Sequence, residues 1–172
     1  MKRKPGRLGM WNSPIWHQND NPKAMVESIM TAMKEYGADE DSLIKTRKLM
    51  KAKFGIGSWQ DVIALHEETL KEQEEHNYID GQLTTLIQLT EYAINDGDKE
   101  RARQYVIKAE ALLASITAVD IEESWLQPHS ISGETLLQLR RAEIQRLHNW
   151  VFWTGLWPGK PTLPNSAWLW HN

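Results

Sequence analysis

Apolar residues recur at helical spacing along most of this chain, in segments that Gly, Pro, Asn and Asp separate. Residues 22–36 show the pattern first. Asn21 and Pro22 suit the start of a helix there, and Gly37 suits its end. No segment alternates apolar and polar residues between turn signals, so we expect no sheet. The pattern predicts an all-α fold of five to six helices, packed as a bundle of αα-hairpins.

Further segments continue this pattern toward the C-terminus. They predict helices over residues 39–54, 58–76, 83–94, 98–116 and 134–157. Asp98 suits the N-cap of one of them, and Gly81 is unfavourable inside another, so we expect a break near residues 77–81. We expect residues 118–133 to form a loop. In the last helix, the residues expected on the buried side are Leu137, Ile144, Leu147 and Val151.

The two ends of the chain differ from its helical middle. The first 20 residues are interrupted by Pro and Gly, and they hold a cluster of cations: Lys2, Arg3, Lys4 and Arg7. Near the other end, a proline at every third position favours an extended polyproline II path. We therefore expect a basic, Trp-containing arm at 1–20, a helical domain at 21–157 and an extended Pro- and Trp-rich tail at 158–172.

Composition excludes several classes of protein. The chain has 172 residues, which suits one domain, and it has no cysteine, which excludes a disulfide framework and a Cys-based zinc site. No apolar stretch reaches the roughly 18 residues that a membrane-spanning helix needs, and none follows the basic start as in a secretory signal. The net charge of −3 does not suit a protein whose whole surface binds nucleic acid. We expect an intracellular (cytoplasmic) or virion protein with no membrane span.

Two groups of residues contain the residue types of a metal site or a catalytic site, but not at the spacing that such a site needs. The first consists of His66, Glu67, Glu68, Glu72, Glu75 and His76. A helix brings Glu72 and His76 one turn apart, but the paired Glu-x-x-His elements of helical di-iron sites are absent, so we expect a solvated acidic face. In the second group, no Gly-x-Ser-x-Gly motif frames His129, Ser130 and Ser132, and capping is the expected role of the serines. We expect no enzymatic activity, cofactor or metal.

One part of the chain is spaced like a known helical hairpin. The matching residues are Leu89, Gly97, Asp98, Ala102, Ala109 and Leu112. Through them, residues 83–116 resemble a single tetratricopeptide-type hairpin, although Thr90 and Ala93 depart from that family's pattern. No second copy follows at a 34-residue spacing, and a generic αα-hairpin accounts for the same residues. The resemblance implies a role in binding proteins.

Tryptophan is unusually frequent, with nine residues against two of Phe. Most of the tryptophans lie toward the ends of the chain: Trp11, Trp16, Trp150, Trp153, Trp157, Trp168 and Trp170. Because Trp offers a large apolar area and is enriched in interface hot spots, we expect these residues to dock on a neighbouring subunit. Two alternatives are that the arms fold back on the protein's own helices, or that they anchor at a membrane interface, for which the tail lacks the usual cations.

These features predict a non-enzymatic structural or adaptor subunit of a larger assembly, with protein partners in a homo- or hetero-oligomer. A phage virion or connector component is one setting for such a subunit. The alternative is a nucleic-acid-handling packaging protein, similar to a small terminase subunit, that uses the basic arm to contact phosphates. The cations for that contact are Lys2, Arg3, Lys4 and Arg7.

Overall fold

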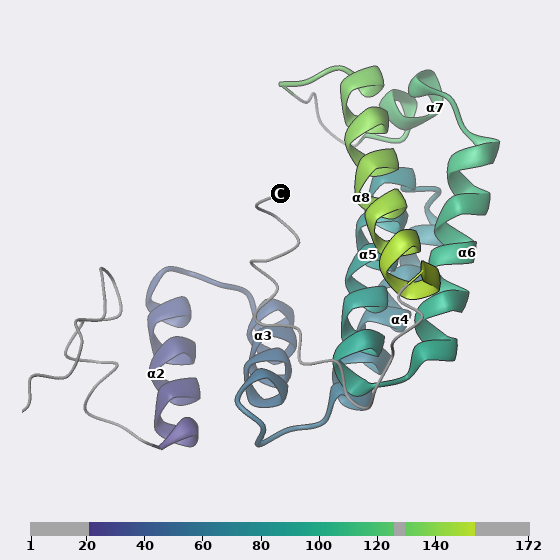
Figure 1. The fold of residues 1–172 in the computed structure, drawn as a ribbon. Coiled ribbons are helices and arrows are strands. Elements are labelled where there is room, and N and C mark those ends of the chain that lie inside the picture. Colours follow the sequence, from purple (N-terminus) through teal and green to yellow (C-terminus); the bar gives the residue numbers. More distant parts are fainter. Residues whose placement is uncertain (1–20, 126–129, 154–172) are drawn as a thin grey trace, which may run out of the picture. The chain divides into compact units, whose positions relative to one another are not determined.

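The computed structural model describes residues 21–125 and 130–153, and every regular element in these ranges is a helix. The helices are α2 (Pro22–Glu35), α3 (Glu40–Lys53), α4 (Trp59–Glu75), α5 (Ile79–Asp96), α6 (Lys99–Ser115), α7 (Ala118–Glu123) and α8 (Gly133–Trp153). No strand occurs in the described ranges, which confirms the predicted all-α class (Figure 1). The predicted arm at 1–20 and tail at 158–172 lie outside the described residues.

Helix starts follow local capping chemistry. The side chain of Asn21 accepts a hydrogen bond from the Lys23 backbone N–H at 3.1 Å, and that of Asp98 accepts one from Arg101 at 3.0 Å, so both predicted N-caps are confirmed. Gly97 ends α5 in the left-handed region, with φ +81°, where only glycine is at ease. These caps fix the two-residue connection that turns α5 back into α6.

The chain divides into two compact units, residues 1–58 and 59–172. In the first unit α2 packs against α3, and the buried apolar residues described there are Val26, Met30 and Ala52. In the second unit α5 packs against α4, α6, α7 and α8 and is buried around nearly its whole circumference (Figure 1). The last helix contributes the residues predicted for its inner side, all of which are buried: Leu137, Ile144, Leu147 and Val151.

Two local predictions were wrong. The helix expected from residue 83 begins at Ile79, so Gly81 lies inside its first turn rather than in the break. The ring of Tyr78 covers Gly81 closely enough that an added Cβ would overlap it, so glycine serves the packing here. The expected loop 118–133 contains α7, because Thr117 and Asp120 form a capping box that starts a short helix.

Candidate functional site

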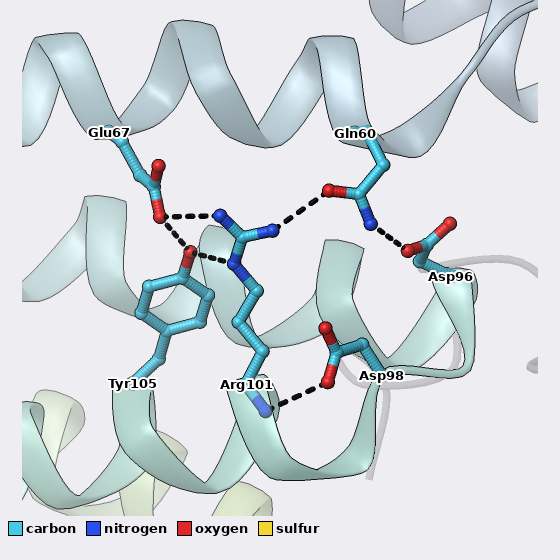
Figure 2. Close-up of polar contacts among 6 residues, drawn as sticks. All are labelled: Gln60, Glu67, Asp96, Asp98, Arg101 and Tyr105. Atoms are coloured by element: carbon cyan, nitrogen blue, oxygen red, sulfur yellow. Dashed lines mark hydrogen bonds and ion pairs between the residues drawn. The ribbon is translucent and has the colours of Figure 1, made fainter.

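Figure 2 shows a polar network that joins α4 to the α5–α6 hairpin. Arg101 donates to the Gln60 side chain at 2.8 Å, to Glu67 at 3.1 Å and to the Tyr105 hydroxyl at 3.1 Å. Tyr105 donates to Glu67, and Gln60 donates to Asp96 at the end of α5. Each polar group is thus held by its neighbours, and the network binds three helices together.

The network also retains the phenolic proton of Tyr105 tightly. Burial, and after it the hydrogen bond to the Glu67 carboxylate, raises the pKa of the Tyr105 phenol well above its usual value. A phenol in this state remains a hydrogen-bond donor at neutral pH. The arrangement therefore suits a structural connection between helices better than proton transfer.

The candidate metal-binding residues, in α4 and directly after it, lie in different environments and do not converge on one point. His66 approaches the Val62 carbonyl through Nδ1 at 2.9 Å and packs edge-on against Tyr92, with ring centroids 4.8 Å apart, while Glu67 belongs to the network above. Four others are exposed, as predicted for an acidic face: Glu68, Glu72, Glu75 and His76. Within residues 21–125 and 130–153, no three His, Asp or Glu side chains are grouped so that they could hold a metal ion.

A partly exposed aromatic surface lies between α6 and the end of α8. The ring of Phe152 stacks on His148, with centroids 4.6 Å apart, and the Arg103 guanidinium lies 5.4 Å from the Phe152 centroid. His148 Nδ1 lies 2.5 Å from the Glu110 carboxylate, which fixes the imidazole. Ile107 occupies the same side of α6, between Arg103 and Glu110, and is 55% exposed. We call these five residues the α6–α8 surface.

The interface residue Trp150, which was predicted from the sequence, lies on a different side of α8 from Phe152. Trp150 is partly buried, and Phe152 stands two residues later, which places it roughly on the opposite side of the helix. Trp153 is the last residue of α8. The other predicted interface and nucleic-acid contacts lie outside the described residues: Lys2, Arg3, Lys4, Arg7, Trp11, Trp16, Trp157, Trp168 and Trp170. No sequence signal marks Phe152 and Ile107, because their neighbours come from two helices far apart in the chain.

A second apolar surface lies on α2. Val26 and Met30 are buried, and the adjacent stripe of α2 lines a hollow of about 450 Å³. The residues lining it are Ile29, Ala32, Met33, Tyr36, Gly37 and Ala38, which we call the α2 surface. Tyr36 is 92% exposed, although the sequence places it in the apolar stripe of this helix. An aromatic side chain this exposed beside an apolar hollow is typical of a docking surface.

Comparison with known proteins adds no relative: no family model, curated protein or solved structure matches this chain. Among the helices of the described residues, none combines the length and the apolar character needed to cross a membrane.

Proposed function

We propose that this chain is a non-enzymatic structural or adaptor subunit of a larger assembly that contains more than one copy of it. A phage virion or connector is a setting that fits such a subunit. The observation that carries the proposal is the α6–α8 surface. It lies where the described helices lead into residues 154–172, a segment with one lysine, no acidic residue and three tryptophans.

The aromatic side chains of the α6–α8 surface are already held in place. Phe152 is 37% exposed and stacks on His148, whose imidazole is fixed by Glu110. Side chains fixed before binding lose little rotamer entropy when a partner covers them. A partly exposed aromatic ring beside Arg and an exposed Ile has the composition of an interface centre. These properties favour the binding of a protein at this surface.

The polar interior supports the same proposal. Glu67 accepts hydrogen bonds from Arg101 and Tyr105. The pKa of Tyr105 lies far above neutral pH, so its phenol keeps the proton. General acid–base catalysis favours groups whose pKa lies near the working pH. The resemblance of residues 83–116 to a tetratricopeptide-type hairpin implies a role in protein binding as well.

Light scattering on the purified full chain tests the proposal. We expect a mass above that of one chain, rising with concentration. Replacing Ile107 and Phe152 by Ser should lower the mass toward the monomer, because the apolar area that drives association is lost. Deleting residues 158–172 should lower it too.

Leu139→Ser is the matched control, since Leu139 is an apolar residue of α8 that is 51% exposed outside the α6–α8 surface. Its mass should equal that of the wild type. Circular dichroism should show the same helicity for all variants. A wild-type chain that stays monomeric at every concentration, or a mass that none of the changes alters, would refute the proposal.

The charge distribution favours one alternative. Residues 1–58 hold eleven Lys and Arg against six Asp and Glu, whereas residues 59–172 hold nine against 17. A packaging protein that handles nucleic acid would use this basic part of the chain. It would bind duplex DNA at low salt, and it would lose binding steeply as salt rises or when the four cations of residues 1–7 are neutralised.

A further inference from the structure

We infer that the N-terminal arm, residues 1–20, docks on the α2 surface of its own chain. It would run antiparallel to α2, with Trp16 toward the start of the helix, Trp11 in the hollow and the basic residues at the acidic turn after α2. This inference concerns the first unit alone and stands independently of the proposed function.

The α2 surface offers an aromatic side chain a place to bury. Ile29, Ala32 and Met33 supply an apolar wall to a hollow of about 450 Å³, and Tyr36 stands at its edge. Aromatic side chains bury about 150–250 Å² each, which makes Trp the side chain with most to gain from this hollow. Residues 1–20 provide two tryptophans, Trp11 and Trp16.

The spacing of the two tryptophans matches the length of the helix surface. Met25 lies on the same side of α2 as Ile29, and from Met25 to Tyr36 the helix advances about 16 Å at ~1.5 Å per residue. Trp11 and Trp16 are also about 16 Å apart if the chain between them is extended at ~3.1–3.3 Å per residue. Residues 17–20 suffice to reverse the chain before α2 begins. The tether is therefore long enough for both tryptophans to reach the α2 surface of the same chain. Because residues five positions apart in a regular extended chain face opposite sides, the placement requires the chain to turn about its axis between them, where Pro14 lies.

The charges agree with the same direction. The turn after α2 and the helix ends that flank it carry four carboxylates: Glu35, Asp39, Glu40 and Asp41. Asp41 pairs with Lys45 at 2.7 Å. The Asp39 carboxylate accepts hydrogen bonds from the backbone and hydroxyl of Ser42, which lowers its pKa and keeps it charged. An arm that places Trp11 in the hollow carries its cations onward to this turn: Lys2, Arg3, Lys4 and Arg7. Apolar and ionic complementarity thus select one orientation.

Covalent connection favours the arm of the same chain over that of a second copy. A segment joined to its site by a few residues has an effective concentration on the order of mM, which exceeds that of free protein in solution at micromolar levels. The occupant is therefore the chain's own arm.

Paired cysteines test this placement in the full chain, which has no cysteine of its own. The reporting pair is Asn12→Cys with Ala32→Cys, and the control pair is Asn12→Cys with Lys34→Cys. Ala32 lines the hollow and Lys34 lies two residues on, roughly on the opposite side of α2. Because a disulfide requires Cα atoms within about 7 Å, we expect the 12–32 disulfide to form within one chain about tenfold faster than the 12–34 disulfide.

Two further variants separate the contributions. Trp11→Ala in the reporting pair should slow disulfide formation several-fold, whereas Val119→Ala, a change at an apolar residue of α7 that is 58% exposed, should leave the rate unchanged. Replacing Lys2, Arg3, Lys4 and Arg7 by Gln should slow it as well, and 1 M salt should reduce that difference by screening. Equal helicity by circular dichroism shows that each variant is folded.

Two outcomes overturn the inference. Equal rates for the two cysteine pairs would mean that the arm has no preferred place on α2. A 12–32 disulfide that forms only between two chains would assign the surface to the arm of a second copy. Neither result depends on whether the full chain is oligomeric through its α6–α8 surface.

Discussion

At the scale of single residues, Tyr92 shows how the burial of one side chain makes the stability of the fold depend on pH. Its ring stacks on Trp59 and meets His66 edge-on, and its hydroxyl lies 3.5 Å from His66 Nε2. Burial, assisted by the charge of Glu91, raises the pKa of Tyr92 to about 12. The folded protein thus retains this proton over a range of pH in which an unfolded chain, with an ordinary pKa near 10, loses it.

This difference predicts how stability changes in alkali. Because the folded pKa is the higher one, the contribution of Tyr92 is fully present below pH 10 and is lost as the pH rises from 10 to about 12. A shift of that size corresponds to roughly 2–3 kcal/mol. Urea denaturation at several pH values should show a shallower alkaline loss of stability in Tyr92→Phe. A variant that loses stability as steeply as the wild type over this range would contradict the assignment to Tyr92.

Single residues also mark the limit of sequence-based prediction. Asn21 and Asp98 could be identified as caps because capping depends on neighbours two or three positions away. The Thr117–Asp120 capping box is equally local, because its two residues are only three positions apart. Gly81 could not be understood locally, because the reason for glycine there is the position of the Tyr78 ring.

At the scale of elements, α5 and α8 are joined by a largely buried ion pair. Arg140 Nε donates to Asp80 at 2.8 Å, and its Nη1 donates to Glu143 at 3.0 Å on its own helix. Asp80 lies in the first turn of α5 and is only 7% exposed. The sequence does not reveal this pair, since the partners are sixty positions apart.

Removal of the cation should therefore cost more than removal of the whole pair. Arg140→Met leaves the Asp80 carboxylate buried without its guanidinium, and we expect a loss of about 3 kcal/mol in the free energy of unfolding. Adding Asp80→Leu should restore most of that loss, because an apolar pair needs no desolvation of charge. Arg141→Met, at an exposed neighbouring position, is the control. Equal destabilisation of the single and the double variant, measured in urea, would show that the ion pair is not the cause.

The elements themselves were largely predictable, and their contacts were not. Apolar spacing identified six of the helices in the described ranges, since it reflects the side that each helix buries. Which helix lies at the centre was not evident, because α5 becomes central through packing with four others. The α6–α8 surface has the same origin. Phe152 comes to lie beside Arg103 of α6 only after α6 and α8 pack together.

At the scale of the whole molecule, most of the buried apolar side chains belong to the second unit. Only Val26, Met30 and Ala52 among the described core residues belong to the first. Two short helices with so few buried side chains gain little from hydrophobic burial, whereas α5 alone contributes most of its residues to a core.

This distribution predicts that residues 59–172 fold without residues 1–58. We expect the shortened chain to unfold in one cooperative thermal transition within a few degrees of the main transition of the full chain. The helicity per residue, measured by circular dichroism, should remain high. A shortened chain that shows no cooperative transition would mean that the second unit needs the first in order to fold.

The position of Gln60 has a mechanical consequence. This residue lies in the first turn of α4, just after the boundary between the two units along the chain. Its side-chain amide accepts a hydrogen bond from Arg101 and donates one to Asp96 (Figure 2). Tension applied to the chain ahead of residue 59 would act on the α5–α6 turn through these hydrogen bonds as well as on the start of α4. A pull on the N-terminal part of the chain would thus act on the α5–α6 hairpin as well as on α4.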